Sequence, residues 1–139
     1  MPGALYRIES VRGEGKPAHM AEEIPEGLSS QPRWLPFKYF YDDRGSRLFE
    51  DITALPEYYQ TRTEERLLAT IAADVVDRVR PAELVELGSG AGRKIRLLLA
   101  AMARAGRLDS CVLLDINTHF LTESARALAT DFPGLLAHC

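Results

Sequence analysis

The chain has 139 residues, and its 46% hydrophobic and 27% charged residues are ordinary for one soluble globular domain. A net charge of -3 lacks the basic excess of nucleic-acid binders, so we expect no nucleic-acid partner. No apolar run approaches the roughly 20 residues of a membrane helix, and no signal-peptide core is present, so we expect a cytoplasmic protein with no membrane partner.

The N-terminal quarter of the chain has a weak structural pattern. Residues 1–31 are rich in charge, Gly and Pro without a sustained period of two or 3.6, which predicts a flexible lead-in. Aromatic residues then crowd together in residues 34–41, and a turn follows. Ser46 is placed to cap a short helix, which should end before Pro56.

A longer helix is predicted after that turn region. Thr61 and Glu64 have the spacing of a capping box, in which each side chain satisfies a free amide of the first turn. Apolar residues then recur at helical spacing as far as Val79, before Pro81 ends the segment. Residues 32–80 are therefore predicted to form an N-terminal helical segment.

The remainder alternates between strands and helices. The expected elements are a strand at 83–87, a glycine loop at 88–92, a helix at 93–104, a strand at 111–114, a helix at 118–130 and the start of a third strand at 135–137. This order is typical of the α/β class with parallel strands. Residues 81–139 are predicted to be the start of a parallel α/β domain.

The glycine loop is the candidate ligand site. A glycine loop between a strand and a helix lets the backbone approach a ligand, and Asp115 after the next strand can bind ribose hydroxyls. The dinucleotide fingerprint would need glycine where Arg93 stands, and the Gly-Lys-Ser/Thr of a P-loop is absent, so nicotinamide binding and triphosphate hydrolysis are disfavoured. A simple tight turn remains the alternative for the loop, and a helix N-terminal acid remains the alternative for Asp115.

Two runs of residues carry a family resemblance. The loop sequence Glu-Leu-Gly-Ser-Gly-Ala-Gly resembles the first motif of Rossmann-like class I methyltransferases. Residues 38–49 (Lys-Tyr-Phe-Tyr-Asp-Asp-Arg-Gly-Ser-Arg-Leu-Phe) and 52–64 resemble the N-terminal signature of the histidine-specific methyltransferase family. The resemblance implies S-adenosylmethionine (SAM) as cofactor and L-histidine as substrate, methylated on its α-amino group in ergothioneine biosynthesis.

The same resemblance implies roles for individual residues, although it assigns no catalytic group and no metal. The residues implied at the amino-acid pocket are Tyr41, Phe49 and Tyr58. Those implied at the cofactor are Gly88, Ser89, Gly90 and Lys94, with Asp115 at the ribose. The alternatives are packing roles for the three aromatics and a solvated charge for Lys94.

The chain also departs from the family pattern. The family commonly has small hydroxyl residues at the positions of Ala91 and Ile95, a proline at Gln60, and Pro-Phe at residues 113–114. Relatives have about seven strands and a second lobe that recognises histidine. We therefore expect a fragment with an incomplete parallel sheet, one uncovered sheet edge and one uncovered core face. A non-catalytic module, or another nucleotide-binding α/β fragment, is the alternative.

Overall fold

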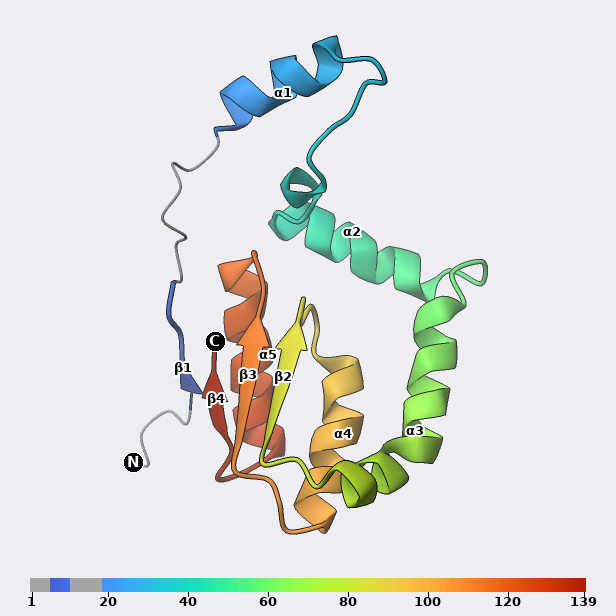
Figure 1. The fold of residues 1–139 in the computed structure, drawn as a ribbon, viewed down its shortest axis with the longest axis vertical. Coiled ribbons are helices and arrows are strands. Elements are labelled where there is room, and N and C mark those ends of the chain that lie inside the picture. The colour runs from blue at the N-terminus through green and yellow to red at the C-terminus, as the bar shows by residue number, and fades with distance from the viewer. Residues whose placement is uncertain (1–5, 11–18) are drawn as a thin grey trace.

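The computed structural model describes residues 6–10 and 19–139 (Figure 1). Its elements in chain order are β1 (Tyr6–Arg7), α1 (Met20–Ser29), the 3-10 helix η1 (Phe37–Phe40), α2 (Asp43–Ala54), α3 (Gln60–Val79), β2 (Glu83–Leu87), α4 (Arg93–Arg104), β3 (Ser110–Leu114), α5 (Thr118–Asp131) and β4 (Leu136–His138). None of the described helices is both long enough and apolar enough to cross a membrane.

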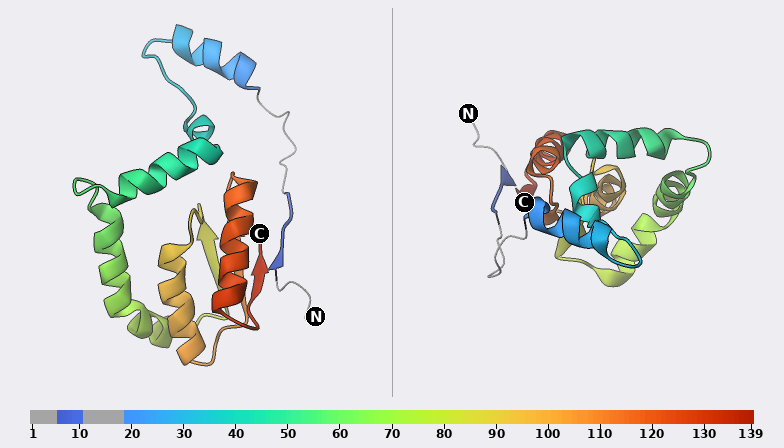
Figure 2. Two further views of the ribbon diagram at one scale, coloured as in Figure 1. Left: turned by 180° about the vertical axis from the view of Figure 1, so that it is seen from behind. Right: turned by 90° about the horizontal axis from the view of Figure 1, so that it is seen from above.

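The strands form one sheet in the order β1-β4-β3-β2, and every neighbouring pair is parallel. Helices α4 and α5 connect consecutive strands and lie together on one face of the sheet (Figure 2). The α/β class and the parallel winding predicted from the sequence are confirmed.

The main core lies between the sheet and these two helices. Its fully buried side chains include Leu99 from α4, Leu113 from β3 and Leu128 from α5. Apolar residues in α4 recur three and four positions apart, so one face of this helix is apolar. A second cluster, in which Val76 packs with Met102, joins α3 to α4.

The other face of the sheet carries apolar side chains that no described element covers. Alternation along the strands places Val85, Leu87, Leu114 and Leu136 on this face, at 54%, 78%, 41% and 50% exposure. Parallel sheets normally have both faces covered. Within the described residues, β2 pairs on one side only. The predicted uncovered face and edge are therefore both present.

Two elements lie in the region where the sequence pattern predicted none. Strand β1 pairs with β4, and α1 forms a ten-residue helix that contains Pro25. A two-residue strand is too short to establish a period, and a proline weakens a helical signal. Whether the lead-in is flexible, and where the segments divide at residues 31 and 80, remain predictions.

Two predicted helix caps are wrong. The N-cap of α2 is Asp42, whose carboxylate accepts a hydrogen bond from the Gly45 amide at 2.7 Å, and Ser46 lies inside the helix. Helix α3 begins at Gln60 without a side-chain cap, and Glu64 instead forms an ion pair with Lys94. The Glu64 side chain therefore points to α4 and not back to the first turn of its own helix.

Candidate cofactor and substrate site

The loop between β2 and α4 requires glycine for its conformation. Gly88, Gly90 and Gly92 have φ values of 75°, 47° and 64°, in the left-handed region that residues other than glycine rarely adopt. A Cβ atom built on Gly88 or Gly90 would meet nothing within 4 Å. The backbone at these two positions therefore faces open space into which a ligand can come close.

Hydrogen bonds hold this loop against the ends of two strands. The Gly88 amide donates to the Leu114 carbonyl at 2.7 Å, and the Gly90 amide donates to Oδ2 of Asp115 at 3.0 Å. On the other side, the Ser124 hydroxyl donates to the Gly90 carbonyl at 2.6 Å. The loop and Asp115 thus form one fixed unit at the carboxyl edge of the sheet, where parallel α/β proteins bind ligands.

Asp115 precedes α5 and is not its cap. The N-cap is Asn117, whose side chain accepts a hydrogen bond from the Phe120 amide at 3.0 Å. Oδ1 of Asp115 accepts from the Asn117 amide at 2.9 Å. Asp115 therefore lies two residues before the N-cap, outside the first turn of α5, and its carboxylate lies at the cavity described next.

Most of the residues assigned to the site line one cavity of about 690 Å³. They are Tyr41, Phe49, Gly88, Gly90, Lys94 and Asp115. Apolar side chains, among them Phe37, Ile116 and Phe120, form much of the remaining wall. This size and mixed lining are typical of small-molecule sites.

The two other assigned residues, Tyr58 and Ser89, line a smaller cavity of about 180 Å³ that shares several walls with the first. The Phe49 ring lies edge-on to Tyr41 and Tyr58, with centroid distances of 6.4 and 6.0 Å. We call these three residues the aromatic cluster. Tyr41 and Phe49 are 41% and 38% exposed, so neither is buried in the core of the described residues.

Lys94 lies on the first turn of α4 and contacts both cavities. Its Nζ atom is 2.8 Å from Oε2 of Glu64 on α3. The pair is partly exposed, so its net contribution to stability is small. The ion pair places the lysine charge at the cavity wall. This position is compatible with contact to the cofactor and with a solvated charge.

Glu86 is a site residue that the sequence reasoning did not assign. It lies in β2 and lines the smaller cavity, where burial raises the pKa of its carboxyl to about 7. Its Oε2 atom is buried without a hydrogen-bond partner, and so is the Ser89 hydroxyl. An acid at an inward-facing position of β2, between Val85 and Leu87, was the available signal, because buried charges require a partner.

The histidines lie apart from one another. His19 precedes α1, His138 lies in β4, and His119 Nε2 is 3.5 Å from Oε1 of Glu123. Among residues 6–10 and 19–139, no group of three or more His, Cys, Asp or Glu side chains is arranged to hold a metal ion.

Sequence comparison identifies the family. Residues 20–139 match the family described as histidine-specific methyltransferase, SAM-dependent. The chain belongs to this family. It is 40% identical over 116 residues to the histidine N-alpha-methyltransferase of Mycolicibacterium smegmatis, a match that covers 84% of this chain and 36% of that protein. The enzyme of the same name from Mycobacterium tuberculosis is 41% identical over 119 residues, with 84% and 37% covered.

A fungal relative of the histidine-specific methyltransferases is also similar. The ergothioneine biosynthesis protein 1 of Neurospora crassa is 41% identical over 87 residues, which are 62% of this chain and 10% of that protein. The match confirms the resemblance to the histidine-specific, SAM-dependent methyltransferase family that the sequence motifs indicated, and it argues against another nucleotide-binding family. The chain spans little more than a third of the mycobacterial relatives, with 36% and 37% of their lengths covered.

Proposed function

We propose that this chain supplies the SAM site and part of the amino-acid pocket of a histidine Nα-methyltransferase of ergothioneine biosynthesis. One observation carries the proposal: the glycine loop, Asp115 and two members of the aromatic cluster line the same cavity. A cofactor and an amine substrate must meet in one enclosed space for direct methyl transfer. The names of the relatives support histidine as that substrate.

The residues present suit SAM. The open backbone at Gly88 and Gly90 accommodates the methionine part of the molecule. The unpartnered Glu86 carboxylate oxygen and Ser89 hydroxyl offer hydrogen bonds to its polar groups, and the α-ammonium is the natural partner of Glu86. Asp115 would accept hydrogen bonds from the ribose hydroxyls. When bound, SAM supplies a methyl group already activated by the positive sulfonium.

The protein's own task is then to position the amine. Because the leaving group is already activated, the rate depends mainly on holding a neutral amine in line with the methyl group. Tyr41 and Tyr58 offer phenolic hydroxyls on either side of Phe49, and we assign them to orienting the histidine α-amine. The Phe49 ring lies edge-on to both tyrosine rings.

Isothermal titration of the 139-residue chain with SAM tests the proposal, with NAD and ATP as comparison ligands. We expect saturable binding of SAM alone. We expect a loss of about tenfold or more in affinity for Asp115→Ala, because the proposed acceptor of the ribose hydroxyls and the hydrogen bond that holds Gly90 are both removed. Absence of saturation by SAM, or equal binding of NAD, would overturn the proposed cofactor site.

Transfer of labelled methyl groups tests the substrate. We expect no methylation of histidine by this chain alone, and methylation after it is combined with the remaining part of the M. smegmatis relative. Labelling of a different amino acid by that combination, with none on histidine, would contradict the assignment of histidine.

A further inference from the structure

Helix α2 carries Phe49 but is not fixed by apolar packing. Thr53 is its one buried residue, and Leu48, Phe49 and Ile52 are 50%, 38% and 42% exposed. At the start of the helix, the Asn117 side-chain amide donates to the Tyr41 carbonyl and the Ser46 hydroxyl, both at 3.2 Å. The second half of the helix must be attached in another way.

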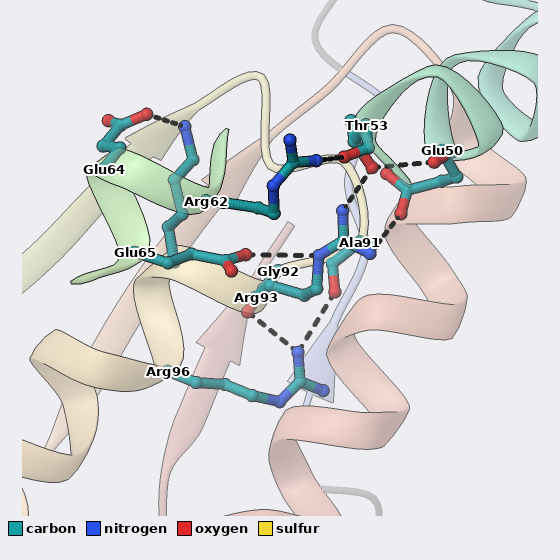
Figure 3. A network of polar contacts seen from close by, with 10 residues as sticks. Glu50, Thr53, Arg62, Glu64, Glu65, Ala91, Gly92, Arg93 and Arg96 are labelled. Carbon is teal, nitrogen blue, oxygen red and sulfur yellow. Dashed lines mark hydrogen bonds and ion pairs between the residues drawn. The ribbon is translucent and has the colours of Figure 1, made fainter. Parts of the chain in front are cut away.

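Arg93 makes that attachment. It is the first residue of α4 and directly follows the glycine loop. Its Nη1 lies 2.8 Å from Oε2 of Glu50, and its Nη2 donates to the Thr53 hydroxyl at 2.9 Å (Figure 3). Its Nε lies 3.4 Å from Oε1 of Glu65 on α3. One planar side chain thus joins the loop to two helices.

Arg62 on α3 completes the network from the other side. Its guanidinium donates to the carbonyls of Thr53, Leu55 and Pro56 at 3.1, 2.8 and 2.8 Å. These carbonyls lie at the C-terminal end of α2, where helix carbonyls have no partner within the helix. Thr53 therefore accepts a hydrogen bond from Arg93 on its hydroxyl and one from Arg62 on its carbonyl (Figure 3).

We propose that Arg93 is a positioning residue that holds α2 against the glycine loop, and so fixes the aromatic cluster relative to the cofactor. The part of this proposal that concerns the cofactor rests on the proposed function. Glu50, its partner, follows Phe49 directly and also lines the main cavity. A shift of α2 would therefore move Phe49 and the cavity wall together.

This role requires a side chain with several hydrogen-bond donors in one plane. Arginine presents five N–H donors in a rigid plane, whereas lysine presents one compact charge on a flexible stem. A lysine at position 93 could pair with Glu50 but could not reach Thr53 at the same time. Arg93 stands at the position where the dinucleotide fingerprint would require glycine. The residue that disfavours nicotinamide binding is therefore also the residue that attaches α2.

Hydrogen exchange and SAM titration of Arg93→Gln, Arg93→Lys and Arg104→Gln test the proposal on the full 139-residue chain. Arg104 is an exposed arginine of the same helix and serves as the matched control. We expect both Arg93 variants to raise exchange in α2 by about tenfold while β2 and β3 are unchanged, because local opening costs less once the attachment is lost. We expect their SAM affinity to fall by about threefold to tenfold, as misplaced site walls predict.

Each other outcome overturns part of the proposal. Equal exchange increases in all elements would indicate a general structural role, and full retention of affinity and protection by Arg93→Lys would show that charge alone suffices. Loosened α2 with unchanged SAM affinity would overturn the link to the cavity. If the unmodified chain does not bind SAM, the proposed function fails for this chain, and exchange in α2 still decides the attachment.

Discussion

The Glu86 carboxyl lies in a strand between apolar neighbours, and its surroundings determine its charge. Burial is the main cause that raises its pKa to about 7, Lys94 opposes the shift, and Asp115 and Glu64 reinforce it. Deprotonation is therefore disfavoured until the pH reaches neutrality. A bound ammonium group would favour the ionised form of the Glu86 carboxyl and so lower the pKa that burial raises.

This gives a pH dependence for SAM binding. Below the pKa of about 7 the carboxyl of the free protein is protonated and must ionise before it pairs with the ammonium, so affinity should rise with pH. We expect about tenfold weaker binding at about pH 6 than at about pH 8, because one unit below the pKa corresponds to a tenfold population change. Calorimetric titration across this range measures the effect, and Glu86→Gln should flatten the profile. A slope that persists in Glu86→Gln would assign the pH dependence to another group.

The glycines of the loop allow a second test at this scale. Gly90→Ala adds a Cβ at a φ of 47°, which costs about 1–2 kcal/mol of stability and intrudes on the ligand space. Gly106→Ala is the matched control, because Gly106 has a φ of 66°, an equally open surrounding and no part in the cavity. We expect similar losses of thermal stability in both variants and loss of SAM affinity in Gly90→Ala only. Equal affinities would mean that the ligand does not approach Gly90.

At the scale of elements, α2 is stabilised chiefly by its ends. Asp42 caps its first turn, Asn117 attaches its start to the β3–α5 connection, and the arginine network attaches its last turns. Helices of 12 residues are marginal in water without such support. The helix that carries Phe49 therefore depends on contacts made by side chains distant in sequence.

The cap of α2 can be tested directly. Asp42→Ala removes the acceptor of the Gly45 amide and should lower the local stability of α2 by about 1 kcal/mol. Hydrogen exchange of peptides that cover α2 measures this change. Asp51→Ala, at an exposed position within the same helix, should change local stability by less than about 0.5 kcal/mol. A loss for Asp51→Ala as large as that for Asp42→Ala would contradict the capping role.

At the scale of the whole molecule, the uncovered sheet face determines behaviour in solution. Val85, Leu87, Leu114 and Leu136 are exposed on this face, and we call them the apolar strip. Val85 and Leu87 lie in β2, which pairs on one side only within the described residues. Exposed apolar strips and unpaired strand edges both favour association. In relatives nearly three times as long as the matched region, further chain is available to cover this face.

We therefore expect the 139-residue chain to self-associate with rising concentration, as measured by sedimentation velocity. Val85→Lys places a charge in the strip and should shift the chain towards the monomer without lowering its melting temperature, because Val85 is 54% exposed. Met20→Lys is the control, since Met20 is equally exposed at 54% but lies on α1, separated from the sheet by α2 (Figure 1). A stable monomer at all concentrations, or equal effects of the two variants, would contradict a role for this strip.

The sequence alone determined the order of elements from α2 to β4, the parallel α/β class and the family, because hydrophobic period, glycine placement and motif spacing are local properties of the chain. Most of the residues that the family resemblance assigned line one cavity in the structure. For the glycine loop and Asp115 the reason is that parallel strands present their carboxyl ends at a common edge. The tertiary structure decided what depends on distant partners: the cap of α2, the raised pKa of Glu86 and the Arg93 attachment. Arg93 and Thr53 are 40 residues apart, and the strength of their contact depends on burial and on the competition among nearby carboxylates. Neither the burial of a side chain nor its competing partners can be read from a local sequence pattern, because both depend on how distant segments pack in the fold.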